Sequence, residues 1–164
     1  MAARKRRTAR KAVTKRPAKR KKAAARAVDR RSKAKPPTLR LRSAIPGFTV
    51  NDLQRSLEFY RDVLGFVAGE PWMENGRMMG IEVKAGTVAF YLGQDDFKKG
   101  RDRMKGVGFR SYCATAQSVD DLAKRIKSRG GVLDHDPQTQ PWGSRDFGIT
   151  DPDGYKLTIA NAPA

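Results

Sequence analysis

The sequence contains one cysteine, one histidine and no long apolar run. These absences exclude several classes of protein. Its single cysteine, Cys113, cannot form an intramolecular disulfide, so the chain does not read as a disulfide-stapled secreted scaffold. No run of about 18 apolar residues is present, so no membrane-spanning helix is predicted. No apolar segment follows the basic N-terminus, and Ser32 is the only serine before residue 43. The sequence therefore predicts neither a secretory signal nor an organelle transit peptide.

Acidic residues are almost absent from the first quarter of the chain. Residues 1–42 contain 19 Lys and Arg and one acid, Asp29, so this tail carries a net charge of +18, equal to that of the whole 164-residue chain. The 16 bases and 16 acids of residues 43–164 cancel. The sequence therefore predicts a basic tail, residues 1–42, followed by a folded domain, residues 43–164.

The tail lacks aromatic residues and consists mainly of Lys, Arg and Ala, which resembles the tails of histone-like and linker-histone proteins. Like charges repel and little apolar area is available, so the tail is expected to be disordered in isolation. Neutralising phosphates would release counterions, which favours salt-sensitive binding of DNA or RNA without sequence preference. A purely solubilising tail, or one that binds an acidic membrane surface, is the alternative. The candidate phosphate-binding residues are Arg4, Lys5, Arg6, Arg7, Lys19, Arg20, Lys21 and Lys22.

The domain contains one pattern twice, offset by 66 residues. Each copy begins with a strand, 44–50 or 112–116, followed by an amphipathic helix. Asn51 and Ser118 are the expected N-caps, and Gly65 and Gly130-Gly131 the expected ends of the helices. The apolar positions of the two helices are Leu53, Leu57, Tyr60 and Leu64, and Val119, Leu122, Ala123 and Ile126.

Three strand-like runs follow each helix, and a glycine hairpin precedes the last run: Ala85-Gly86 in one copy, Asp153-Gly154 in the other. Residues 94–106 are expected to form a partly helical linker between the copies. The predicted fold class is α+β, with two βαβββ modules that form paired curved mixed sheets around a trough. The predicted strands are 66–72, 77–83 and 87–92, then 132–135, 145–150 and 156–160.

Two stretches carry a resemblance to a known family. "FTVNDLQRSLEFYRDVLGF", residues 48–66, and "QPWGSRDFGITDPDGYKLTI", residues 140–159, resemble the vicinal oxygen chelate (VOC) superfamily of glyoxalase I, bleomycin-resistance proteins and extradiol dioxygenases. The second stretch is most similar to the bleomycin-resistance-like branch. The resemblance covers residues 43–161 and implies the paired βαβββ fold and a binding trough, but it does not fix a reaction.

The resemblance also implies where a metal would be bound in related enzymes, on the first and last strand of each module. The matching positions here are Ile45, Phe90, Ser111 and Thr158, whose side chains are not the hard ligands of such a site. The only histidine, His135, lies between two aspartates and is interpreted as a surface residue. No metal and no cofactor is therefore predicted, and no catalytic triad can be assembled around one histidine.

The resemblance implies a trough lined by alternate strand residues. Aromatic walls with a few polar anchors are typical of small-molecule pockets. Arg145 could anchor a carboxylate or phosphate, or could pair with Asp151 or Asp153.

Cys113 is interpreted as buried and inert. The carboxylate pairs Asp95-Asp96 and Asp120-Asp121 are placed at helix starts. The candidate ligand-binding residues are Trp72, Phe90, Tyr112, Trp142, Arg145 and Phe147, with Met79 beside them; the two Trp residues could instead fill the core.

These features favour a metal-independent VOC domain that binds a small organic molecule and is tethered to nucleic acid by its tail. One alternative is a metal-dependent, glyoxalase-like lyase or isomerase. Another is a nucleoid-associated architectural protein whose domain serves to dimerise. The expected partners are a small organic ligand and nucleic acid, with no membrane and with a homodimer left open. The expected location is the cytoplasm, at the nucleoid, or the nucleus in a eukaryote.

Overall fold

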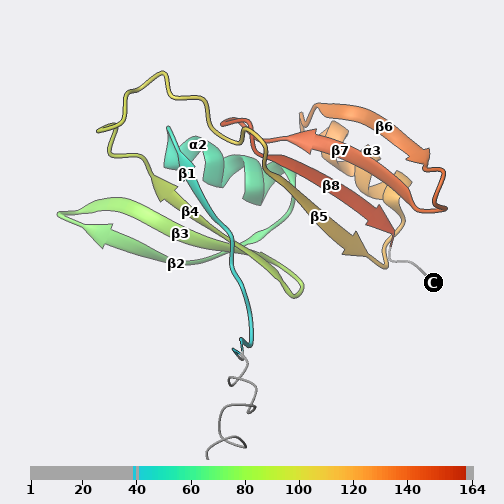
Figure 1. Ribbon diagram of the computed structural model, residues 1–164, viewed down its shortest axis with the longest axis horizontal. Helices are drawn as coiled ribbons and strands as arrows, with labels where there is room; N and C mark the ends of the chain where they lie inside the picture. Colours follow the sequence, from blue (N-terminus) through green and yellow to red (C-terminus); the bar gives the residue numbers. More distant parts are fainter. Residues whose placement is uncertain (1–38, 40, 162–164) are drawn as a thin grey trace, which may run out of the picture. The chain divides into compact units, whose positions relative to one another are not determined.

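The computed structural model describes Leu39 and residues 41–161, so the predictions for the tail lie outside the described residues (Figure 1). Residues Ser43–Ala164 form one compact unit. It contains two four-stranded mixed sheets, in which the first strand runs parallel to the last strand of its module. The predicted pair of βαβββ modules is confirmed. None of the described helices is long and apolar enough to cross a membrane.

The strands of the first sheet lie in the order β1-β4-β3-β2, and those of the second in the order β5-β8-β7-β6. The first module contains β1 (Gly47–Val50), β2 (Val67–Glu74), β3 (Arg77–Ala85) and β4 (Val88–Gln94). The second module contains β5 (Arg110–Thr115), β6 (Leu133–Thr139), β7 (Arg145–Thr150) and β8 (Lys156–Asn161). All eight strands were predicted to within a few residues. The hairpin between β2 and β3 was not predicted, although its Asn75 and Gly76, with φ of 50° and 75°, form a favoured tight-turn pair.

The helix of the first module has two parts. It begins as α2 (Leu53–Glu58) and widens into a π-helical turn, η1 (Phe59–Val63), in which the N–H of Leu64 donates to the carbonyl of Phe59. The N-cap is Asp52 rather than the predicted Asn51, because the Asp52 carboxylate accepts from the N–H of Arg55 at 3.0 Å. Asn51 is instead used in contacts with the second module and the linker.

The helix of the second module, α3 (Val119–Ser128), matches the prediction. The hydroxyl of Ser118 caps its N-terminus, and Val119, Ala123 and Ile126 are buried against the sheet. Asp120 and Asp121 lie in its first turn, as expected, where the helix dipole favours negative charge.

One aromatic core spans both modules. Phe48 on β1 stacks on Phe90 of its own sheet, with ring centroids 4.9 Å apart, and on Tyr155 of the second module at 4.4 Å. The Tyr155 hydroxyl accepts from the N–H of Thr49 and donates to its carbonyl, each at 3.1 Å. The second module is thereby fixed to the edge strand of the first.

The turn between β7 and β8 is the main joint between the modules. Asp153 accepts from the N–H of Asn51 at 2.8 Å and from the hydroxyl of Ser56 at 3.2 Å. Asp151 accepts from the hydroxyl of Tyr60 at 3.1 Å, and burial raises the pKa of this carboxyl. The "TDPDGY" stretch that carries much of the family resemblance is therefore first of all a structural joint.

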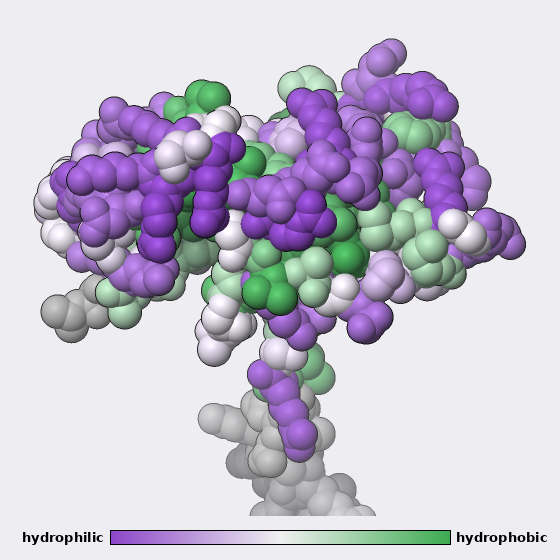
Figure 2. Space-filling model, turned by 180° about the vertical axis from the view of Figure 1, so that it is seen from behind, coloured by the Kyte–Doolittle hydropathy of each residue, from purple (hydrophilic) through white to green (hydrophobic). Residues whose placement is uncertain are grey.

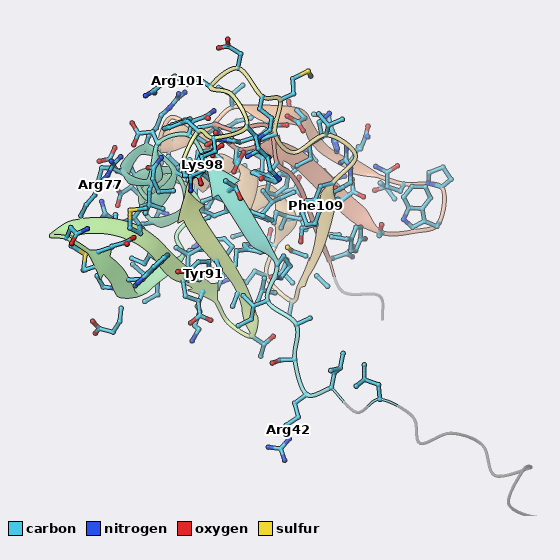
Figure 3. The ribbon with its side chains drawn as sticks, turned by 60° about the vertical axis from the view of Figure 1, so that its left-hand side comes forward. Arg42, Arg77, Tyr91, Lys98, Arg101 and Phe109 are labelled. Carbon is cyan, nitrogen blue, oxygen red and sulfur yellow. The ribbon has the colours of Figure 1, made fainter. Side chains whose placement is uncertain are left out.

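The linker contains no helix within residues 95–106, which corrects the prediction of a partly helical segment and of a helix start at Asp95-Asp96. Its geometry is set instead by Asp95, whose carboxylate lies 2.7 Å from Lys105 Nζ and 2.9 Å from Arg103 Nη2. The Lys105 ammonium also donates to the side chain of Asn51. Lys98 and Arg101, which Figure 3 labels, are exposed on this loop.

Candidate ligand-binding surfaces

The helix-free face of the second sheet carries exposed side chains on β5. Arg110 and Tyr112 are exposed, whereas Ser111 and Cys113 are half-buried, which is the alternation of a strand with one covered face. Arg110 Nη1 donates to Oγ1 of Thr158 on the neighbouring β8 at 2.9 Å. A cation and an aromatic ring therefore lie two residues apart on one face.

Two exposed aromatic rings meet at a single hydroxyl beside this row. The indole N–H of Trp142 donates to Ser144 Oγ at 2.7 Å, and the Tyr112 hydroxyl donates to the same oxygen at 3.5 Å. The two aromatic residues are 70% and 54% exposed. A ring whose polar end is held by a hydrogen bond can offer its face to a ligand with little further loss of entropy. This arrangement suits a planar organic molecule.

The helix-free face of the first sheet has a second aromatic surface. Trp72 on β2 is paired with Gly80 on β3, and the Tyr91 side chain of β4 lies over the same glycine. Figure 3 labels Tyr91 on its strand. A Cβ atom at Gly80 would come within 2.2 Å of the Tyr91 hydroxyl oxygen, so the absence of a side chain there makes room for the ring. Trp72 is 55% exposed.

The predicted ligand-binding residues lie in different surroundings. Trp72 and Tyr112 are on the helix-free faces, and Trp142 lies in the turn after β6. Phe90 and Phe147 are fully buried on the sheet faces that the helices cover. Of the described residues, Phe147 is the one candidate that lines the large cavity described below.

Arg145 has a partner other than the ones predicted. Its guanidinium forms two hydrogen bonds with the Asp120 carboxylate at the start of α3, at 2.7 and 2.6 Å, and not with Asp151 or Asp153. Arg145 lowers the pKa of Asp120, whose negative charge is stabilised by the paired hydrogen bonds. Met79, the remaining candidate, is half-buried on β3.

The positions matched to metal ligands need a correction in register. Phe90 points to the core and its neighbour Tyr91 to the helix-free face; Ser111 likewise points to the covered face of its sheet. Thr158 lies on the helix-free face beside Arg110, while Ile45 precedes β1. With the register corrected, the positions that match metal ligands carry the hydroxyls of Tyr91 and Thr158 and the guanidinium of Arg110. Over residues 41–161, no three His, Cys, Asp or Glu side chains come close enough to hold a metal ion, so these residues do not fit a family-type site.

His135 and Cys113 show no catalytic arrangement with each other or with a carboxylate. Nδ1 of His135 lies 3.0 Å from the backbone carbonyl of Asp136, and its ring covers Gly148. Cys113 Sγ lies 3.7 Å from the hydroxyl of Ser111, and burial raises the pKa of its thiol. Cys113 is half-buried rather than buried as predicted, and its raised pKa slows the reactions of the thiol without preventing them.

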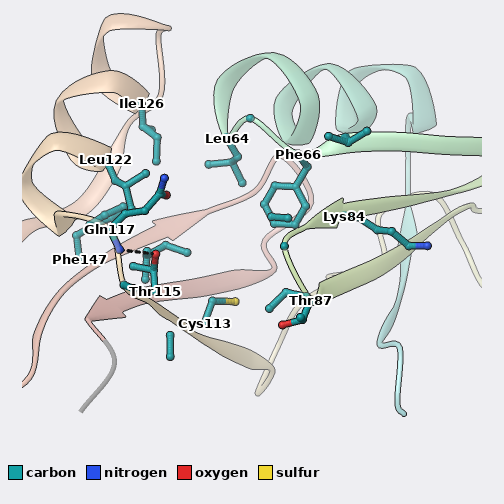
Figure 4. A pocket seen from close by; sticks show the side chains of 18 residues that line it. Leu64, Phe66, Lys84, Thr87, Cys113, Thr115, Gln117, Leu122, Ile126 and Phe147 are labelled. Carbon is teal, nitrogen blue, oxygen red and sulfur yellow. Dashed lines mark hydrogen bonds between the residues drawn. The ribbon is translucent and has the colours of Figure 1, made fainter. Parts of the chain in front are cut away.

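A cavity of about 530 Å³ lies where the two modules meet on the helix-covered side (Figure 4). Leu64 and Phe66 at the end of the first helix form one wall, and Leu122 and Ile126 of α3 form the opposite one. Figure 2, viewed from behind, shows apolar surface along the middle of the unit between two strongly hydrophilic regions. The remaining lining residues are Gly65, Val67, Lys84, Ala85, Gly86, Thr87, Val88, Cys113, Ala114, Thr115, Ala116, Gln117, Phe147 and Ile159.

Sequence reasoning missed Arg110, Ser144 and the cavity itself. Arg110 could have been found, because the alternation of Arg110, Tyr112 and Ala114 opposite Ser111 and Cys113 is visible in the sequence. Ser144 and the cavity had no sequence signal, because each depends on segments distant in the chain.

The chain matches the family model of the Glyoxalase/Bleomycin resistance protein/Dioxygenase superfamily over residues 43–159, and it belongs to this superfamily. No curated protein matches the sequence.

Several solved structures share the fold at low sequence identity. A superfamily member from Sphaerobacter thermophilus DSM 20745 is 23% identical with a TM-score of 0.59; the alignment covers 73% of this chain and 98% of that one. TioX from Micromonospora sp. ML1 is 16% identical, with the same TM-score and the same coverage. A lactoylglutathione lyase from Agrobacterium tumefaciens is 22% identical with a TM-score of 0.54, over 74% of this chain and 96% of that one. These similarities establish the fold and leave the activity open.

Proposed function

We propose that this protein is a metal-independent, bleomycin-resistance-like member of its superfamily that binds a planar organic molecule and is tethered to nucleic acid by its tail. The observation that carries the proposal is the pair of exposed rings, Tyr112 and Trp142, that share the hydroxyl of Ser144. Arg110 on the same face supplies a positive charge for an anionic substituent. Metal independence is supported by the hydroxyl and guanidinium groups at the positions where related enzymes hold their ion.

A homodimer is part of this proposal. Trp72 and Tyr91 on one helix-free face and Tyr112 on the other are exposed aromatic residues. Large exposed apolar surfaces mark interaction sites in soluble proteins. Two copies that pair these faces around a two-fold axis would enclose the ligand between two sheets, and would bring two basic tails onto one stretch of nucleic acid.

The ligand proposal is tested by thermal unfolding of the full chain against a panel of planar aromatic acids and neutral analogues, with and without divalent metals. A ligand at 100 times its dissociation constant adds about 2.7 kcal/mol of stability, which is a measurable shift. Tyr112→Ala and Trp142→Ala should each reduce the shift. Val132→Ala, at an apolar residue that is 80% exposed on another surface, should leave it unchanged. Stabilisation by a divalent metal alone, or an activity that a chelator removes, would contradict the proposal.

The nucleic-acid part of the proposal rests on the charge of residues 1–42 and is tested separately. The full chain should shift a nonspecific DNA duplex at low salt, and its affinity should fall steeply with increasing salt because counterions are released on binding. A chain that lacks residues 1–42 should bind far more weakly. Equal binding by both chains would contradict tethering by the tail and would leave the ligand proposal untouched.

A further inference from the structure

The cavity between the modules is separate from the proposed ligand surface. None of Trp72, Tyr112 and Trp142 lines it, and its walls come mainly from the segment after the first helix, from one side of α3 and from the strands β5, β7 and β8. Phe147, which is fully buried, is one of its lining residues. A volume of about 530 Å³ lies in the range of small-molecule pockets, about 300–1,000 Å³.

The lining of this cavity carries almost no charge. Among the described residues that line it, Lys84 alone is charged, and its ammonium is paired with Glu82 at 3.0 Å. The hydroxyl of Thr115 is already bonded to the N–H of Gln117 at 3.1 Å (Figure 4). The thiol of Cys113 stays protonated because burial raises its pKa. A charged ligand group would therefore lose its hydration and would meet only uncharged polar groups and an ammonium that is already paired.

The uncharged polar groups of the cavity are few. Figure 4 shows the sulfur of Cys113 and the hydroxyl of Thr87, from the turn between β3 and β4, on the same side, whereas the side-chain amide of Gln117 lies beside Leu122 on the opposite wall. An apolar body with one hydroxyl or carbonyl group matches this distribution, because each part of the molecule meets surface of its own kind.

We propose that this cavity is a second binding site, for a neutral, mostly apolar small molecule with one weakly polar group. The site is distinct from the aromatic surface that the proposed function uses. The cavity would bind an uncharged ligand, whereas the aromatic surface offers the positive charge of Arg110 to an anionic group. The chain has one cysteine, and it lines the cavity, so the thiol reports directly on whether the site is occupied.

The test uses the full chain, the neutral fluorescent probe N-phenyl-1-naphthylamine and the neutral thiol reagent N-ethylmaleimide. Probe fluorescence should rise and saturate as the probe enters the cavity. At a free probe concentration about ten times its dissociation constant, mass action leaves about one site in eleven empty, so alkylation of Cys113 should slow about tenfold. In the reciprocal experiment, alkylated protein should no longer bind the probe.

The chemical class is tested by competition. 1-Naphthalenemethanol should displace the probe, whereas 1-naphthoate, of the same shape but negatively charged, should be at least about tenfold weaker because its charge has no partner in the cavity. Ala116→Trp, at an exposed residue on the rim, and Leu122→Trp, which fills the interior, should both weaken probe binding. The rim variant keeps the test valid if the interior variant does not fold. Val132→Ala, at an exposed residue that does not line the cavity, should leave probe binding unchanged.

Three results would overturn the proposal. The first is probe binding that persists after Cys113 is alkylated. The second is a thiol that reacts at the same rate with and without saturating probe. The third is a dimer in which Cys113 is shielded without any probe and becomes reactive on dilution to monomer, because a second copy would then occupy the cavity.

Discussion

Replacement of Lys105 by methionine should destabilise the protein far more than the same change at another lysine of the same loop. Lys105 is almost fully covered, and its ammonium contacts the carboxylate of Asp95, which is also covered, and the side chain of Asn51. Methionine keeps the apolar stem and removes the charge. Asp95 would then keep Arg103 and the N–H of Phe97 as its partners.

The magnitude follows from the depth of the pair. Removing one partner of a deeply buried ion pair costs about 3–5 kcal/mol, and an exposed pair contributes about 0–1 kcal/mol. The Asp95–Lys105 pair lies between these limits, because it is covered but shallow, and Arg103 beside it is 37% exposed at its side chain. We therefore expect a loss of about 2 kcal/mol in the free energy of unfolding, intermediate between the two cases.

The effect should depend on pH. Hydrogen bonds from Lys105 and Arg103, and from the N–H of Phe97, hold the pKa of Asp95 well below its usual range. A carboxyl whose pKa is lowered by folding stabilises the folded state above its unfolded pKa of about 3.9, and this contribution is lost as the pH falls through the folded value. The difference between wild type and Lys105→Met should therefore be largest near neutral pH and should shrink below about pH 4.

Urea unfolding of the full chain, monitored by tryptophan fluorescence, measures the effect. With an m value of about 1.5 kcal/mol per molar, a loss of about 2 kcal/mol lowers the midpoint by a little over about 1 M. Lys98→Met is the matched control, because Lys98 is 83% exposed at its side chain and pairs with the exposed Asp96, so it should change stability by less than about 0.5 kcal/mol. Equal effects of the two substitutions, or an Lys105→Met effect that grows in acid, would refute the assignment of Asp95 and Lys105 as the anchor of the linker.

The remaining predictions concern the joint between the modules. Gly106→Ala should destabilise the chain strongly in the same urea assay, because a Cβ atom there would come within 2.1 Å of the Gly154 carbonyl and φ is +68°. Gly100→Ala, where φ is also positive but no atom lies within 4 Å, should cost less stability. Equal losses of stability would count against close packing of the linker on the hairpin. Tyr60→Phe should lower the free energy of unfolding by about 1.5–3 kcal/mol at neutral pH, because it removes the hydrogen bond to the buried Asp151 carboxylate. Tyr91→Phe, which changes an exposed ring, should leave stability nearly unchanged. A small effect at Tyr60 would mean that this hydrogen bond adds little stability. Arg145→Ala should lower stability by about 1 kcal/mol or less, because the ion pair with Asp120 is half-exposed. The effect should decrease in high salt, which screens exposed charges, and the unfolding midpoint measured at increasing salt concentration checks this.

The sequence carried most of the secondary structure because its signals are local. The apolar Phe147 and Ile149 alternate with Asp146, Gly148 and Thr150 in the sequence of β7, and the apolar residues of α3 recur at helical spacing; each signal arises within a few consecutive residues. The errors occurred where a distant partner decides. Asp52 rather than Asn51 is the N-cap, because the backbone N–H of Asn51 donates to Asp153 of the second module. Asp95 does not begin a helix, because it forms an ion pair with Lys105 in the linker.

The candidate sites were less predictable than the fold, because the face on which a strand residue lies depends on register. A shift of one residue exchanges the covered and open faces of a strand. This is why Phe90 was assigned to the trough although it lies in the core, and why Tyr91 beside it was missed. The contact of Arg145 with Asp120 spans 25 residues, and no spacing rule selects it over Asp151 or Asp153.

The sequence by itself determined the uneven charge and the duplicated βαβββ pattern, because composition and short-range periodicity are properties of consecutive residues. Two of its motifs carry the resemblance to the superfamily, and the family model confirms membership. The tertiary structure alone decided which aromatic residues are exposed, where Tyr112 and Trp142 meet at Ser144, and that a cavity lined by the single cysteine lies between the modules. These features arise from contacts between segments dozens of residues apart, whose geometry is fixed only when both modules pack on a common core.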